Sequence, residues 1–220
     1  MFIGHYGPAF VGAAVEPKVK LWHMFAAVQL VDIVWAIFIL TGIEQMRVTP
    51  GHTAASPLDL YHMPYTHSLV MSFVWAGAGA GAYFLLRRGA GRMAAIVIGA
   101  GILSHWFADL IVHTQDLELW IGGPKVGLGL WHYREVSLLV EIGVLVGGVF
   151  LYQQYTEPSH QLGEYSPGLF MGFMIALQAF NTFGPPPPGP TAAAITALFA
   201  YIALIGGAAL LDYTRTPKAP

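Results

Sequence analysis

The sequence contains no cysteine, and this absence removes several kinds of chemistry at once. Without thiols the chain can form no disulfide bond, hold no metal through thiolate ligands and use no cysteine nucleophile. Any metal ion must therefore be bound by His, Asp or Glu side chains. The chain has 9 histidines and 12 acidic residues from which such a site could be built.

Charged residues are also scarce. They make up 10% of the 220 residues, whereas hydrophobic residues make up 55%. Soluble domains carry roughly 25% charged residues, so this composition predicts an integral membrane protein. The net charge of -2 and the lack of a basic cluster give no indication of nucleic-acid binding. The segment Met1–Pro8 lacks the basic region of a cleavable signal peptide, so we expect the helices themselves to direct membrane insertion.

Six apolar runs reach or approach the ~20 residues that a helix needs to cross a bilayer. They are Leu21–Ile43, Thr66–Leu86, Met93–His113, Val136–Tyr155, Pro167–Phe183 and Thr191–Leu211. A shorter apolar segment, Ile3–Val15, precedes them and is expected to be a re-entrant or interfacial helix. The pattern predicts an all-α integral membrane protein, with one polytopic domain over residues 1–213 and a flexible tail over residues 214–220.

Lys and Arg residues are distributed unevenly between the two ends of the predicted helices. One end holds seven of them: Lys18, Lys20, Arg87, Arg88, Arg92, Arg215 and Lys218. The other end holds three: Arg47, Lys125 and Arg134. Because cytoplasmic loops carry an excess of Lys and Arg, both termini are predicted to be cytoplasmic. His62, His67, His113 and Glu44 then lie toward the opposite surface.

The stretch Ser104–His113, at the end of the third apolar run, carries the most distinctive pattern. Positions four apart share one face of a helix, so His105, Asp109 and His113 form a polar stripe. Such a stripe is costly in a membrane unless its members are paired or coordinated. Imidazole nitrogens and carboxylate oxygens are ordinary zinc ligands, so the stripe indicates a metal site. A seam of interhelical hydrogen bonds, or ligation of haem or chlorophyll, are the alternatives.

Counting residues from the basic end places further metal-competent side chains at a similar depth. At 1.5 Å per helical residue, His5 and His105 lie roughly 20 Å deep, Asp32 roughly 18 Å, Asp109 about 25 Å and His67 about 30 Å. These side chains could still face different directions within that layer. We predict a divalent-metal site, with zinc as the expected ion. Its ligands would come from His5, Asp32, His62, His67, His105, Asp109 and His113.

Four short motifs that contain these residues follow one another along the chain. They are Gly4-His5, Asp32, His62-x4-His67-Ser68-Leu69 and Ser104-His105-x2-Ala108-Asp109. Together they resemble a bacterial family described as LexA-binding, inner-membrane-associated, predicted metal-dependent hydrolases. The resemblance covers residues 1–120 and implies a bacterial inner-membrane location and a hydrolase ancestry.

Two departures from the family pattern bear on the chemistry. The family's Arg-Gly within the third motif is replaced by Met63-Pro64. Its Asp-x-Asp-His is reduced to Asp32-Ile-Val-Trp35, so a second carboxylate and a histidine are missing. The second difference argues against a mechanism that uses two metal ions.

Metal-assisted hydrolysis is the function that these residues favour. A zinc-type ion with an open position lowers the pKa of bound water to about 7. Asp109, Asp32 or Glu44 would act as general base, and Ser68 could orient water or a substrate oxygen. The depth of the site favours a lipid or lipid-linked ester or phosphoester as substrate. Such a substrate would enter the site from among the surrounding membrane lipids.

Two other functions remain open at this point. The cluster could be the polar core of a non-catalytic accessory subunit in a larger membrane complex. It could also be part of a carrier for protons or divalent metals, which would need polar residues along a whole transmembrane path. The cytoplasmic half of the helices is largely apolar, so the carrier ranks below the other two.

Overall fold

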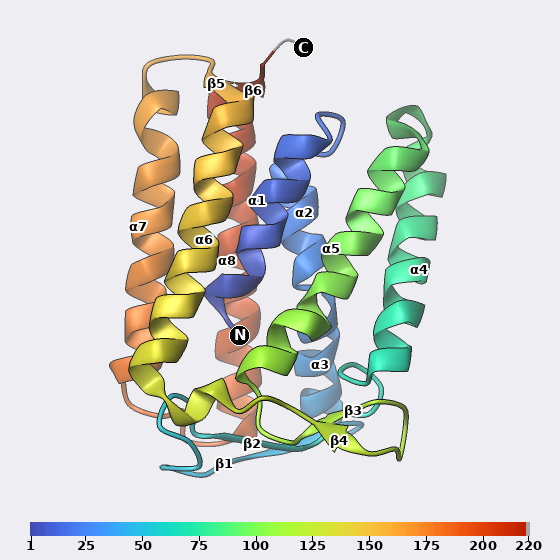
Figure 1. Cartoon of the computed structure of the whole chain (residues 1–220), viewed down its shortest axis with the longest axis vertical. Coiled ribbons are helices and arrows are strands. Elements are labelled where there is room, and N and C mark those ends of the chain that lie inside the picture. The colour runs from blue at the N-terminus through green and yellow to red at the C-terminus, as the bar shows by residue number, and fades with distance from the viewer. Residues whose placement is uncertain (219–220) are drawn as a thin grey trace.

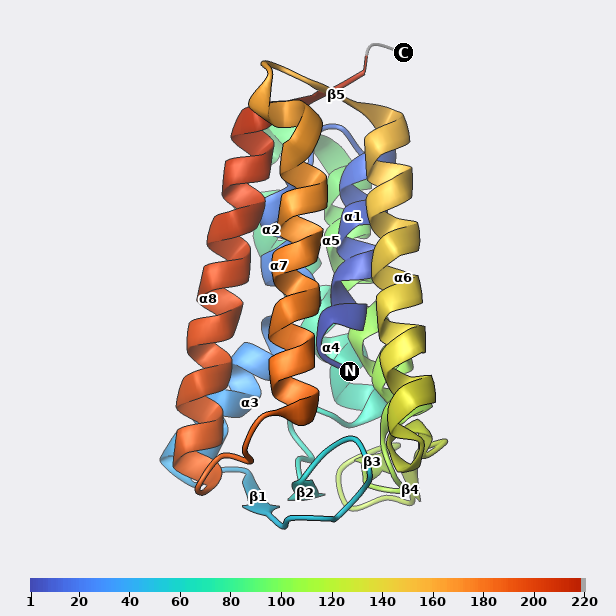
Figure 2. The same cartoon turned by 90° about the vertical axis from the view of Figure 1, so that its left-hand side faces the viewer.

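The protein is a helical bundle with small two-stranded β-sheets at both ends (Figures 1 and 2). The computed structural model describes residues 1–218, and the predicted tail residues 219–220 lie outside the described residues. Helices account for 68% of the chain, which confirms the mainly helical class predicted from composition. The strands were not predicted.

The helices follow the apolar runs of the sequence with small shifts at their ends. A 3-10 turn, η1 (Ile3–His5), leads into α1 (Tyr6–Val15). The other helices are α2 (Leu21–Val28), α3 (Leu30–Thr41), α4 (Leu69–Leu86), α5 (Gly91–Val112), α6 (Arg134–Tyr155), α7 (Leu162–Phe183) and α8 (Pro190–Thr214). The strands pair as β1 (Gln45–Val48) with β2 (Leu58–His62), β3 (Leu117–Glu118) with β4 (Lys125–Val126), and β5 (Thr156–Pro158) with β6 (Arg215–Pro217).

Four helices within the described residues are long and apolar enough to cross a membrane: α4, α5 with its preceding turn, α6 and α8. The bent pair α2 and α3 makes a fifth span when it is counted as one. Helix α7, which we predicted to span, has sufficient length but is not among them. Glu164, Gln178 and Asn181 lower its hydropathy.

The first predicted span is broken at Gln29, where α2 and α3 meet at an angle of 47°. Gln29 has φ -103° and ψ 1°, outside the helical range, and its side-chain amide donates to the Asp32 carboxylate at 2.5 Å. Because the helix stops here, the carbonyl of Val28 is free to accept a hydrogen bond from His105. The break therefore leaves a backbone acceptor available to a polar side chain inside the bundle.

Helix α1 lies inside the bundle, between α2, α5 and α6 (Figure 1). Ile3, Tyr6 and Phe10 have no exposed surface, so this segment is an internal helix and not an interfacial one. It approaches α6 through Gly7 and Gly148, where a Cβ added to Gly148 would lie 2.5 Å from the Gly7 carbonyl oxygen. This close approach holds η1, and with it His5, in the middle of the molecule.

The two ends of the bundle differ in charge, as the sequence predicted. The α1–α2 and α4–α5 connections and the C-terminal segment lie at one end with seven basic residues, and the hairpins β1–β2 and β3–β4 lie at the other (Figure 1). Residues 215–217, expected in a flexible tail, form β6 and pair with β5. The Arg215 guanidinium fastens this pairing by donating to the Thr156 hydroxyl and carbonyl and to the Gly163 carbonyl.

Candidate metal centre

The Asp109 carboxylate lies at the centre of a buried group of histidines. Its Oδ1 is 3.1 Å from Nε2 of His5 and 3.6 Å from Nε2 of His113. Its Oδ2 is 3.1 Å from Nε2 of His105 and 3.7 Å from Nε2 of His67. All five side chains are at most 4% exposed. The amino group of Met1 also contacts Oδ1.

Asp32 provides a second carboxylate on the opposite side of His105. Its Oδ1 is 3.2 Å from Nε2 of His67 and 3.5 Å from Nε2 of His105. Its Oδ2 accepts hydrogen bonds from the Gln29 amide and, at 3.0 Å, from the Tyr201 hydroxyl. One oxygen is therefore held by the protein, while the other faces the histidines.

His105, His67 and His113 each use Nδ1 for a hydrogen bond that determines their tautomer. Nδ1 of His105 lies 2.7 Å from the carbonyl oxygen of Val28, which can only accept, so Nδ1 carries the proton. Nδ1 of His113 donates in the same way to Asp116 at 2.9 Å. In both neutral rings the lone pair is then on Nε2, which faces the Asp109 carboxylate.

The tautomer of His67 is set through two further residues. The Thr66 hydroxyl has one proton, which it donates to the Glu44 carboxylate at 2.6 Å. It therefore accepts from Nδ1 of His67 at 2.7 Å. Nε2 of His67 lies at hydrogen-bond distance from Oδ1 of Asp32, 3.2 Å away, so a proton on Nε2 would be donated to this carboxylate and a bound metal ion would take that proton's place. Glu44 is itself fixed, since it also accepts from the backbone amides of Tyr65 and Thr66.

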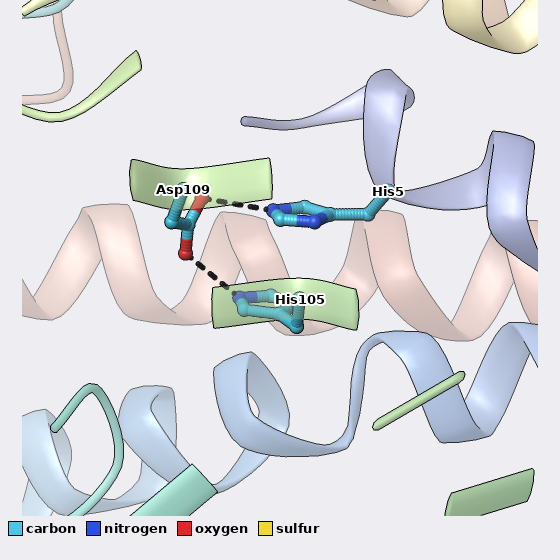
Figure 3. A group of neighbouring side chains, drawn as sticks. All are labelled: His5, His105 and Asp109. Carbon is cyan, nitrogen blue, oxygen red and sulfur yellow. Dashed lines mark ion pairs between the residues drawn. The ribbon is translucent and has the colours of Figure 1, made fainter. Parts of the chain in front are cut away.

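His5 stacks on His105, with ring centroids 3.7 Å apart and planes 4° from parallel (Figure 3). Two positively charged imidazolium rings would repel each other at this distance, so the stack argues against both rings being charged at once. Neither nitrogen of His5 nor Nε2 of His105 has a hydrogen-bond partner, although Asp109 oxygens lie 3.1 Å away. The His5 and His105 nitrogens are thus close to the Asp109 oxygens but are not aligned for hydrogen bonds. A cation bound between these nitrogens and oxygens would give each of them a partner.

Two groups of three side chains have ligand atoms close enough to hold one ion. One is His5, His105 and Asp109 (Figure 3), and the other is Asp32, His67 and His105. The groups share His105, and one nitrogen lone pair binds one ion, so His105 Nε2 marks the centre of the site. Imidazole and carboxylate together suit zinc and other divalent first-row metals.

Glu141 and the N-terminal turn explain how His5 reaches the centre. The Glu141 carboxylate on α6 accepts from the backbone amides of Phe2 at 2.7 Å and Gly4 at 3.2 Å. These bonds anchor η1 next to α6, so that His5 points toward α5.

The structure brings together His5, Asp32, His67, His105, Asp109 and His113, and leaves three other predicted residues outside. His62 lies on β2, opposite Gln45, and belongs to neither group. Ser68 is the N-cap of α4 and accepts from the Met71 amide, which is a structural contact. Glu44 reaches the centre only through Thr66 and His67.

Sequence reasoning missed Tyr201 and the role of Gln29 at Asp32. Tyr201 is 6% exposed within α8, a helix in which no motif was recognised. A tyrosine in the middle of an alanine-rich apolar helix is a weak signal, because most such residues only pack. Its hydrogen bond to Asp32 depends on how α8 packs beside α3, which the sequence alone does not reveal.

A cavity of about 620 Å³ leads from the metal centre toward the hairpin end of the bundle. Asp32, His67, Asp109 and His113 line its inner part, together with Tyr201. The remaining wall comes from the β1–β2 connection, the first turns of α6, and the facing ends of α7 and α8. This volume falls within the range of about 300–1,000 Å³ that is typical of small-molecule sites.

Comparison with known proteins adds no relative. No protein-family model, no curated protein and no solved structure matches the chain. The resemblance to the LexA-binding family rests on the four motifs alone and stays a prediction.

Proposed function

We propose that the protein is a membrane-embedded, metal-dependent hydrolase that acts on an ester or phosphoester of a lipid or a lipid-linked molecule. The apolar helices cross a bacterial inner membrane, with the α1–α2 connection and the C-terminal segment at the basic, cytoplasmic end. The N-terminus, which we predicted at that end too, lies inside the bundle, where the Met1 amino group contacts Asp109 (Figure 1). The site, near the other end, faces the cavity. The motif resemblance and the distribution of Lys and Arg support this placement.

One observation carries the proposal: the Nε2 atoms of four histidines converge on the carboxylates of Asp109 and Asp32. Nδ1 of His67, of His105 and of His113 is committed to an oxygen acceptor. Hydrogen bonds of this kind orient metal-binding histidines and raise their basicity. Nε2 of His105 and both nitrogens of His5 have no hydrogen-bond partner, so hydrogen bonds within the cluster do not account for these buried atoms.

The ligand set also leaves room for substrate. A bound zinc-type ion would supply Lewis acidity and a water of lowered pKa. Asp32 and Asp109 both line the cavity; Asp32 turns one oxygen toward the histidines and Asp109 turns both. Either carboxylate would be placed to take a proton from water there. Tyr201 and Gln29 hold the second oxygen of Asp32, which keeps the first one directed at the reacting water.

The test uses the full chain purified in detergent and a panel of fluorogenic lipid esters and phosphoesters. We expect hydrolysis of at least one class that chelation removes and that added zinc restores. The variants H67A and H105A should lose both metal and activity. The matched control H62A, at the same end of the protein but outside both groups, should keep both. Retention of metal in the H67A/H105A double variant would contradict the proposal.

A further inference from the structure

The cavity that reaches the metal centre has one cationic side chain in its wall. Among the described residues that line it, Arg134 is the single Lys or Arg. Arg134 is the first residue of α6, at the hairpin end, and is partly buried. It belongs to neither metal-binding group and was not predicted as a site residue.

The Arg134 guanidinium has unused hydrogen-bonding capacity. Its Nε donates to the Ala54 carbonyl at 2.5 Å, which orients the side chain toward the β1–β2 connection. Within the described part of the chain, neither terminal nitrogen has a hydrogen bond, and no carboxylate lies within 4.0 Å. A guanidinium with two free donors in a fixed plane is suited to a carboxylate or phosphate.

Two buried polar groups that line the same cavity also lack partners. Nε1 of Trp35 has no acceptor and Oε1 of Gln178 has no donor, although these residues are only 5% and 4% exposed. A buried polar group without a partner costs free energy, so such groups in a cavity wall indicate a polar ligand or water. They offer one donor and one acceptor besides the cationic Arg134.

The opposite wall of the cavity is apolar and lies at the surface of the bundle. It is formed by Leu177 and Phe180 of α7 and by small residues of α8, Ala193, Ala197 and Ala200. Phe180 is 66% exposed, so this wall continues onto the outer face of the helices. A hydrocarbon chain could lie here while a polar head occupies the interior.

We propose that the cavity binds a single-chain amphiphile with an anionic head, and that Arg134 recognises the negative charge. This inference rests on the proposed function, since it names the charge of that enzyme's substrate. An anionic head at Arg134 would place the adjoining ester along the cavity that leads to Asp32 and Asp109. Arg134 is then a residue that determines specificity and takes no part in the chemical step.

Binding can be measured without turnover, because Trp35 and Trp131 line the cavity. The probe is dibromostearate, whose bromine atoms quench nearby tryptophan fluorescence, in alkaline buffer where its carboxyl group is ionised. Its methyl ester is the neutral comparison, and both probes are measured on protein treated with a chelator so that the ester is not hydrolysed to the acid. We expect the acid to bind about tenfold more tightly than the ester, the scale of one charge-assisted hydrogen bond.

The variants distinguish the effect of the Arg134 charge on binding from an effect on folding. R134Q should lower the affinity for dibromostearate about tenfold and leave the ester unchanged. R134K keeps the charge and should retain most of the preference, even if the contact with Ala54 is weakened. R92Q, in the first turn of α5 at the basic end of the bundle and outside the cavity wall, is the matched control and should bind as the wild type does. W131F should reduce the quenching amplitude, because Trp131 lies in the cavity wall.

Equal binding of the acid and the ester would overturn the inference, and so would unchanged affinity in R134Q or unchanged quenching in W131F. Displacement of dibromostearate by inorganic phosphate alone would show that the apolar wall contributes nothing, which also overturns it. A protein that binds the acid selectively but hydrolyses no ester would contradict the proposed function alone. A metal-dependent hydrolase without charge preference would contradict this inference alone.

Discussion

The contact between Gly7 and Gly148 provides a sharp test of how α1 positions the metal centre. In a G148A variant the new Cβ would lie 2.5 Å from the Gly7 carbonyl oxygen and 2.8 Å from the Gly7 Cα atom. Both neighbours are backbone atoms, so no side chain can rotate away. Helix α1 must therefore move away from α6, and His5 moves with it.

The adjacent Gly147 supplies the control, because a Cβ added there meets nothing within 4 Å. Replacing glycine by alanine within a helix gains roughly 1 kcal/mol in either variant. This gain cancels in the comparison of G148A with G147A, so the difference reports the overpacking alone. Overpacking costs about 1–3 kcal/mol, which corresponds to a difference of about 2–12 °C in Tm for a protein of this size.

The assay is thermal unfolding of both variants in detergent, together with their zinc content. We expect G147A to be as stable as the wild type or more stable, with unchanged zinc. G148A should unfold at a lower temperature and bind zinc more weakly, because His5 is withdrawn from Asp109. Equal Tm and equal zinc content in the two variants would refute the close approach of α1 and α6.

Four further substitutions test individual contacts in and around the site. Replacing Glu44 with Gln, or Thr66 with Val, should lower zinc affinity about 10–100-fold, because His67 loses the hydrogen bonds that set its tautomer; competition with a fluorescent chelator measures this. Tyr201→Phe should keep the metal but reduce the hydrolysis rate, since Asp32 loses a donor at 3.0 Å, and equal rates would argue against that role. His62→Ala should change neither zinc affinity nor rate, and a loss of metal there would contradict the placement of His62 on β2.

Part of the candidate metal site was predictable from local rules. His105 and Asp109 are four residues apart on one helix, so their common face follows from helical periodicity. The depth count placed His5, Asp32 and His67 in the same layer but could not say which way they face. The structure shows that they face one another, an outcome that depends on how α1, α3 and α5 pack.

What the sequence did not reveal depends on contacts between distant segments or on breaks in regular structure. The bend at Gln29 interrupts an apolar run that reads as one continuous helix, and nothing in the local composition marks it. Tyr201 and Arg134 become site residues only once α8 and α6 are placed around the cavity. The strands are only two to five residues long, which is too short for an alternating apolar pattern to predict them.

Metal analysis of the purified full chain, with its visible absorption spectrum, tests the central claim most directly. The account predicts about one zinc or similar divalent ion per chain and no visible absorption band. In the H105A variant the ion should be lost, because the two groups of ligands share His105. Wild-type protein without bound metal, or with a haem or chlorophyll band, would contradict the account.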